Sequence, residues 1–144
     1  MVHALEQIHS LLKPFDVTQG EPGGYLIDIH PNGELVEFIL PLEEGEQFIG
    51  YMQETDDYIE YHQADDAIDA ILAAGLFQVV KSGEFEFLTH ADSFDELKTF
   101  VIDSWSDALV TDEVIANARR LEKEHGKRKT LLREGVRIGL LKKT

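Results

Sequence analysis

The residues best suited to chemistry are an aspartate and a histidine two positions apart in "YLIDIHP", residues 25–31. Alternate residues of a β-strand point to the same face, so Asp28 and His30 would share a face if this segment is a strand. A carboxylate beside an imidazole can orient the ring, which can then act as a general base. The alternative is a histidine that only hydrogen-bonds the turn after the strand, which is the commoner role. Asp28 and His30 are therefore the candidate catalytic pair.

A second group of polar residues lies in "YIEYHQADDAID", residues 58–69, where a helix would bring several ligand-type side chains to neighbouring positions. Histidine and carboxylate ligands of this kind could hold a divalent cation. Helical metal motifs need a second segment that supplies ligands, and none is identifiable, so a solvated acidic face is favoured. We expect no metal site. The residues concerned are Glu60, His62, Asp65, Asp66 and Asp69.

The sequence also excludes several classes of site. The chain has no cysteine, which rules out disulfide bonds, thiolate metal ligands and cysteine nucleophiles. It has no P-loop, zinc signature or Ser-His-Asp spacing. Neither a membrane-spanning apolar run nor a secretion signal is recognisable, so we expect a cytoplasmic protein. Core, interface or surface roles are expected for His3, His9, His90 and Trp105.

The charge is unevenly distributed along the 144 residues, whose formal net charge is −15. Residues 1–116 carry 25 acidic and three basic residues, whereas residues 117–144 carry ten basic and three acidic residues. The acidic part would repel nucleic acid, which is not an expected partner. The basic part has a regular apolar pattern, so we expect it to pack on the acidic part of its own chain rather than to form a disordered arm.

Apolar periodicity and capping signals predict four helices, over residues 2–13, 56–74, 94–104 and 111–125. Pro14 would stop the first helix, Asp56 would cap the second, and Gly75 would end it. Ser93 and Glu96 form a capping box for the third helix. In the fourth, an apolar face would dock on the sheet, with Arg119, Arg120 and Lys123 outward.

Strands are predicted over residues 25–30, 35–42, 47–53 and 130–143. Pro41 indicates an edge position or the end of a strand. Residues 76–91 read as a hairpin that bends at Ser82 and Gly83. Together the elements predict one domain over residues 1–144, of the α/β or α+β class, with a mixed sheet, flanking helices and at least one helix crossing between strands.

The order of these elements resembles the C-terminal half of a class I S-adenosylmethionine-dependent methyltransferase. In that family the helix before the fifth strand commonly ends Leu-Lys-Pro-Gly-Gly, and the strand begins at once. Here "LLKP" matches the end of that helix and "PGGYLIDIHP" matches the glycines and the following strand. The segment "FDVTQGE" is inserted between the two matches. A helix ending in "AAGLF", a Phe-rich strand in "GEFEFLTHADSFDEL" and the last strand "VRIGLLKK" continue the likeness to the final strand and closing hairpin of the sheet. The resemblance spans residues 4–143 and places His30 near the substrate side of the cleft.

The family binds its cofactor with a Gly-rich loop after the first strand and an acidic residue at the end of the second. Both would precede residue 1, and the chain has no G-x-G-x-x-G. We therefore expect no cofactor site, and a binding or interaction module rather than an enzyme. The alternative is the C-terminal part of a functional methyltransferase, completed by a separate chain or by upstream sequence that would supply S-adenosylmethionine binding. A third option is an unrelated small-ligand-binding protein.

The strand "YLIDIHP" bears on the oligomeric state of the protein. If the chain holds only the C-terminal half of the methyltransferase sheet, this strand lies at an open edge of the sheet. Such an edge must be covered or it pairs with another chain. The strands "ELVEFILPL" and "QFIGYMQE" could cover it within the monomer. The alternative, which we expect, is a homodimer that weakens as salt rises, because each basic tail would lie on the acidic face of the other copy. A separate methyltransferase-like chain is the other possible partner.

Overall fold

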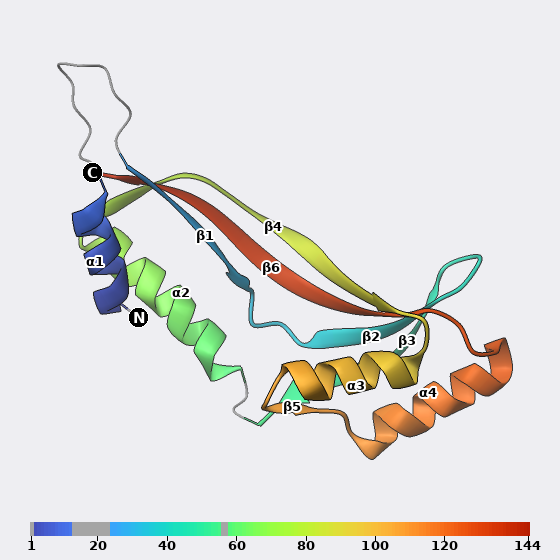
Figure 1. Cartoon of the computed structure of the whole chain (residues 1–144). Coiled ribbons are helices and arrows are strands. Elements are labelled where there is room, and N and C mark those ends of the chain that lie inside the picture. Colours follow the sequence, from blue (N-terminus) through green and yellow to red (C-terminus); the bar gives the residue numbers. More distant parts are fainter. Residues whose placement is uncertain (1, 13–23, 56–57) are drawn as a thin grey trace. The chain divides into compact units, whose positions relative to one another are not determined.

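The computed structural model describes residues 2–12, 24–55 and 58–144 (Figure 1). This part of the chain has the α+β composition expected from the sequence. Expectations for Pro14, for most of the turn at residues 22–24 and for Asp56 lie outside it. No helix in these ranges is long and apolar enough to cross a membrane. The elements are α1 (Val2–Leu11), β1 (Tyr25–Pro31), β2 (Val36–Pro41), β3 (Glu46–Glu54), α2 (Ile59–Ala73), β4 (Phe77–Ala91), α3 (Phe94–Ser104), β5 (Ala108–Leu109), α4 (Asp112–His125) and β6 (Thr130–Lys143).

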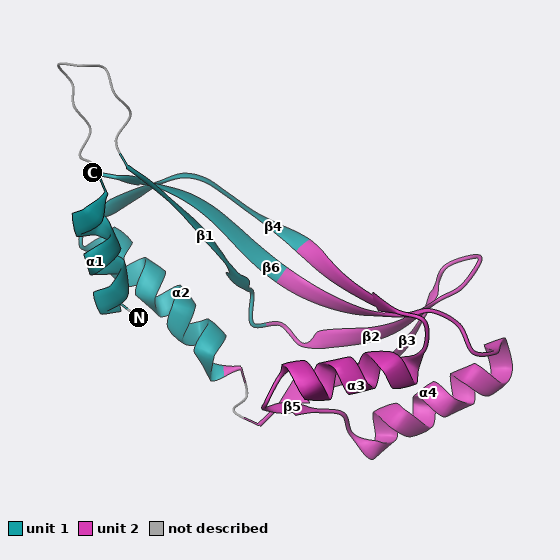
Figure 2. Cartoon of the chain, viewed as in Figure 1, with its two compact units in different colours: residues 1–33, 59–85, 136–144 teal, residues 34–58, 86–135 magenta. Residues whose placement is uncertain are grey.

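Contacts divide the chain into two compact units (Figure 2). Unit 1 contains residues 1–33, 59–85 and 136–144, and unit 2 contains residues 34–58 and 86–135. The long strands β4 and β6 each contribute residues to both units. The expectation of one domain over the whole chain stays a prediction.

In unit 1, β6 lies between β1 and β4. β1 is antiparallel to β6, with Tyr25 opposite Lys142 and His30 opposite Arg137. β4 also runs antiparallel to β6, because Leu76 contacts Thr144 whereas Glu84, further along, contacts Arg137. β1 and β4 therefore run in the same direction without being neighbours, and the expected mixed sheet has antiparallel neighbours instead.

The core of unit 1 forms where α1 and α2 cover one face of these strands. Ile71, Phe77 and Leu141 are buried there, and α1 packs on α2. Gly75 follows α2 at φ 69°, a conformation that glycine adopts without strain, so the chain turns directly into β4. Partly buried leucines and an isoleucine complete this core, namely Leu5, Leu12, Leu26, Ile68, Leu72 and Leu76.

In unit 2, β2 is antiparallel to both β3 and β6, and the short β5 pairs with the end of β3. The helices α3 and α4 bury apolar side chains, among them Leu97, Val101 and Leu121. Pro41 is the last residue of β2, as one of the two sequence alternatives expects. Further buried residues of this unit include Val36, Phe38, Ile39, Leu40, Ile49, Met52, Phe94, Val114, Ala118, Leu131 and Leu132.

The capping box predicted for the third helix is present, and α4 also has a side-chain cap. The Ser93 hydroxyl accepts a hydrogen bond from the Glu96 amide at 3.3 Å, as a capping box requires. The Glu96 carboxylate returns to the amide of Asp92, one residue before the cap, at 3.0 Å. Thr111 caps α4 in the same way through the amide of Val114.

The prediction of a hairpin over residues 76–91 is wrong. β4 is one strand of 15 residues, and Gly83 is not among the glycines with positive φ that a tight two-residue hairpin turn requires. Its partner β6 is almost as long, so pairing with β6 keeps the chain extended through the Ser-Gly pair. A Cβ at Gly83 would lie 4.0 Å from Cγ2 of Ile138, an ordinary van der Waals contact with the neighbouring strand.

Four of the five arginines of the basic C-terminal part pair with carboxylates of the same chain. Arg119 contacts Asp95, and Arg133 contacts Glu46 at 2.6 Å, both within unit 2. The hydrogen bond from Arg133 lowers the pKa of the Glu46 carboxyl, although burial opposes this. These contacts agree with the expectation that the basic part packs on its own chain.

Candidate functional site

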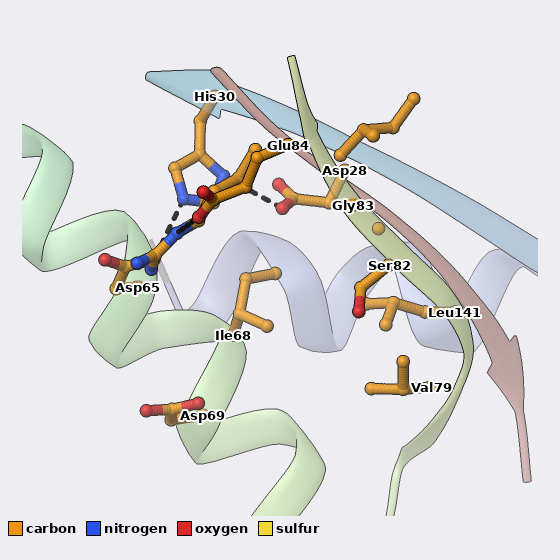
Figure 3. Close-up of a pocket in the computed structure, with 13 residues that line it drawn as sticks. Asp28, His30, Asp65, Ile68, Asp69, Val79, Ser82, Gly83, Glu84 and Leu141 are labelled. Carbon is orange, nitrogen blue, oxygen red and sulfur yellow. Dashed lines mark hydrogen bonds and ion pairs between the residues drawn. The ribbon is translucent and has the colours of Figure 1, made fainter. Parts of the chain in front are cut away.

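A pocket of unit 1 brings the candidate pair Asp28 and His30 together with Asp65, Glu84 and Arg137 (Figure 3). Asp28 and His30 share one face of β1, as strand periodicity predicts, and this is the face covered by α2. Asp65 comes from α2, Arg137 from β6 opposite His30, and Glu84 from β4. Four elements therefore supply the site.

His30 lies between two carboxylates. Its Nδ1 is 2.8 Å from Oδ2 of Asp28, and its Nε2 is 3.0 Å from Oδ1 of Asp65. The histidine side chain is only 12% exposed. Both nitrogens can donate hydrogen bonds at once only when the ring carries two protons, that is, as an imidazolium. Through these two contacts the ring connects β1 with α2.

Arg137 extends this arrangement to β4. It donates hydrogen bonds to Oδ1 of Asp65 at 2.7 Å and to Oε1 of Glu84 at 3.2 Å. Burial raises the pKa of the Asp65 carboxyl, but hydrogen bonds from His30 and Arg137 outweigh burial, and the pKa lies below its ordinary value. The hydrogen bond to Asp65 also raises the pKa of the Arg137 guanidinium.

The pocket itself has a volume of about 420 Å³ and an apolar wall formed by Ile68, Val79 and Leu141. In a general base, one ring nitrogen must face the substrate with a free lone pair. Here Asp65 occupies the position in front of Nε2. His30 could therefore act as a base only after Asp65 has turned away. Among the residues that the structure describes, its two ring nitrogens contact Asp28 and Asp65, and not the turn after the strand that the second expected role required.

The polar residues of α2 that could hold a cation lie in different surroundings in the structure. Among the described residues, no group of three or more histidine, cysteine, aspartate or glutamate side chains is placed to hold a metal ion. Asp65 turns to His30, whereas the ring of His62 lies beside Gly33, where an added Cβ would be 3.4 Å from it. Asp66 and Asp69 are exposed, as a solvated face requires.

The other residues singled out from the sequence have separate structural surroundings. His9 packs edge-on against Phe77, with ring centres 5.2 Å apart. His3 lies 3.6 Å from Glu6 on the exposed side of α1. Trp105 is partly buried beside Phe100 at the end of α3. None of these residues belongs to the His30 pocket.

Unit 2 holds a second group of titratable residues, near the end of β3. Tyr58 donates a hydrogen bond to the carbonyl of Met52 at 2.6 Å and has a φ of 62°, which is unusual for a tyrosine. Burial, with a contribution from Glu54, raises the pKa of Tyr58 to about 12. Burial alone raises the pKa of the Glu134 carboxyl. Sequence patterns give no indication of this group.

Comparison of the chain with protein-family models, with curated proteins and with solved structures found no match. The function is therefore inferred from the residues and their geometry.

Proposed function

We propose that this chain is a methyltransferase-like module that has no S-adenosylmethionine site of its own within residues 1–144 and acts by binding another protein. The arrangement of strands in unit 1 is the observation that carries this proposal. β1 precedes α2 and β4 in the chain, with β2 and β3 between β1 and α2, and β6 lies antiparallel between β1 and β4. The resemblance of the sequence implies the order strand, helix, strand and last strand, but α3, β5 and α4 lie between β4 and β6, so these two strands do not form the closing hairpin that it also implies.

A binding role is supported by the uncovered edge of unit 1. Among the described residues, β1 pairs with β6 on one side and with no strand on the other. The strands β2 and β3, which could have covered this edge, pair with each other and with β6 and β5. A free strand edge is a template for another strand, so association is the function that this geometry favours.

In this proposal, Asp28 and His30 are structural rather than catalytic. They hold the carboxyl end of β1 on α2 through Asp65. The contacts keep the strand in place while its outer edge is exposed. Both this interpretation and its alternative keep the cytoplasmic location expected from the sequence.

The alternative is the C-terminal part of a functional S-adenosylmethionine-dependent methyltransferase. The same free edge of β1 favours it, because the resemblance would place there a strand of the half that carries the Gly-rich cofactor loop. In that case, His30 and Asp28 would lie near the substrate side, and loss of the Asp65 contact would free Nε2 of His30 for proton transfer.

Isothermal titration of residues 1–144 with S-adenosylmethionine tests the proposal. We expect no binding heat for S-adenosylmethionine or for its demethylated product. Binding with a Kd in the micromolar range would overturn the proposal. The alternative predicts that binding appears only after a protein carrying the Gly-rich half is added, and a pull-down followed by the same titration measures this.

A further inference from the structure

We propose that the free edge of β1 pairs with β1 of a second copy of this chain, antiparallel and centred on Ile27. This inference rests on the proposed binding role and names its partner. The edge belongs to the less charged part of the molecule: unit 1 has nine acidic and five basic residues, against 19 and eight in unit 2. Repulsion between two copies is therefore weaker at this edge than elsewhere.

The direction of the backbone groups in β1 follows from one hydrogen bond. The amide of Lys143 donates to the carbonyl of Gly24 at 2.9 Å, so Gly24 forms a hydrogen-bonded pair with β6. In an antiparallel ladder, hydrogen-bonded and non-bonded pairs alternate. Even-numbered residues of β1 therefore bond to β6, and Tyr25, Ile27 and Ile29 point their amide and carbonyl groups outward. Pro31 also lies on this outward side but has no amide hydrogen.

The register follows from these groups and from one charge. Pairing centred on Asp28 would place two Asp28 residues directly opposite each other, and like charges in this position are destabilising. Pairing centred on Ile29 would place Ile27 opposite Pro31, which cannot donate. Pairing centred on Ile27 places no two aspartates opposite each other and does not involve Pro31. Each residue that pairs has both an amide hydrogen and a carbonyl that point outward. This pairing forms roughly six backbone hydrogen bonds across the two copies.

Side chains support the same register. Ile27 and Ile29 are 62% and 58% exposed on the face opposite α2, and Tyr25 is 43% exposed. With Ile27 at the centre, the two Ile27 side chains meet, and Tyr25 of each copy lies opposite Ile29 of the other. Cross-strand pairs of aromatic and β-branched residues are among the stabilising ones. Arg119, Arg133 and Arg137 pair with carboxylates of their own chain. A dimer joined through β1 therefore differs from the dimer expected from the sequence, and we expect it not to weaken in salt.

Disulfide cross-linking tests this pairing in a chain that has no cysteine of its own. In Ile27→Cys, the two Cα atoms would lie about 5.5 Å apart, within the range that a disulfide bridges. The matched control is Ile29→Cys, similarly exposed on the same strand, whose two copies would be about 13 Å apart. We expect copper-phenanthroline to convert most of Ile27→Cys, and little of Ile29→Cys, to a disulfide-linked dimer on a non-reducing gel.

A second variant prevents pairing between the two copies and leaves the hydrogen bonds between β1 and β6 within each copy intact. Ile27→Pro deletes an amide hydrogen that points outward, so it should abolish the dimer in sedimentation velocity while unit 1 stays folded. A wild-type dimer at about 50 μM in low and high salt, with selective cross-linking at position 27, supports the inference. A monomer at that concentration, or preferential cross-linking at position 29, or a dimer that cross-links at neither position, overturns it. S-adenosylmethionine titration tests the proposed function separately, so the two failures are distinguishable.

Discussion

His30 and Asp65 join strand β1 to helix α2 across 35 residues of sequence, with Nε2 of the histidine 3.0 Å from Oδ1 of the aspartate. The same oxygen accepts a hydrogen bond from Arg137 on β6. One carboxylate therefore receives donors from two strands. Hydrogen bonds to an ionised acceptor are stronger than neutral ones, so Asp65 is the residue on which this arrangement depends.

Replacement of Asp65 by asparagine should destabilise the protein at neutral pH. The Asp65→Asn substitution keeps the shape of the side chain but removes the charge that both donors face. Loss of charge-assisted hydrogen bonds at a partly buried site costs on the order of 2 kcal/mol, which corresponds to a fall in Tm of roughly 4–8 °C. Thermal unfolding followed by circular dichroism at pH 7 measures the change.

The loss of Tm caused by Asp65→Asn should be larger at neutral pH than at low pH. The pKa of Asp65 is lower in the folded chain than its ordinary value, so the charge stabilises the fold above the ordinary pKa, and this stabilisation is lost as the pH falls through the lower folded value. The difference in Tm should therefore shrink below about pH 4. Asp66→Asn, at the exposed neighbouring position, should leave Tm within about 1 °C. Equal losses in the two variants would contradict this account.

The sequence predicts part of this site and misses the rest for a physical reason. Asp28 and His30 share a face because the period of a strand is two, which is a local property. Asp65, Glu84 and Arg137 join them through pairing of β1 with β6 and packing of α2, which no local pattern encodes. The helical pattern groups Asp65 with its neighbours, and only the tertiary contact separates it from Asp66.

The error at Gly83 has a similar origin. A Ser-Gly pair between apolar segments is a turn signal when only the local sequence is considered. A glycine can instead lie within a continuous strand, which it weakens but does not end. Pairing with a strand as long as β6 decides between these two uses of glycine, and the length of β6 is not visible from residues 76–91. Capping signals are local, and the capping box predicted at α3 is confirmed.

Gly50 of β3 packs closely against α4, so a larger residue at this position should destabilise the protein. A Cβ added there would lie 2.6 Å from Cγ2 of Val114, a distance that requires the helix to shift. Gly50→Ala should therefore lower Tm by several degrees, since overpacking a core costs about 1–3 kcal/mol. The double variant Gly50→Ala with Val114→Ala removes the clashing methyl groups and should be more stable than the sum of the single effects predicts. Additive losses in this cycle would show that the two residues are not in contact.

The buried face of α4 gives a further test. Leu121 is 1% exposed, whereas Arg119, Arg120 and Lys123 on the same helix are exposed, as the helical pattern predicts. Leu121→Asp would bury an unpaired charge and should lower Tm by about 5 °C or more. Lys123→Asp makes a comparable change in side chain on the exposed side and serves as the control. An unchanged melting curve for Leu121→Asp would show that this face is not buried in solution.

Glu134 is expected to oppose folding at neutral pH. Burial raises the pKa of its carboxyl, so the folded chain holds this proton more tightly than the unfolded chain does. The resulting stabilisation is fully present below the ordinary carboxyl pKa and is lost as the pH rises through the raised value. Glu134→Gln should consequently raise Tm at pH 7, on the order of 2 °C, and the gain should disappear near pH 4, where the wild-type carboxyl is largely protonated. A lower Tm for the glutamine variant at pH 7 would contradict the prediction, because it would mean that the ionised carboxylate gains more from its surroundings than its burial costs.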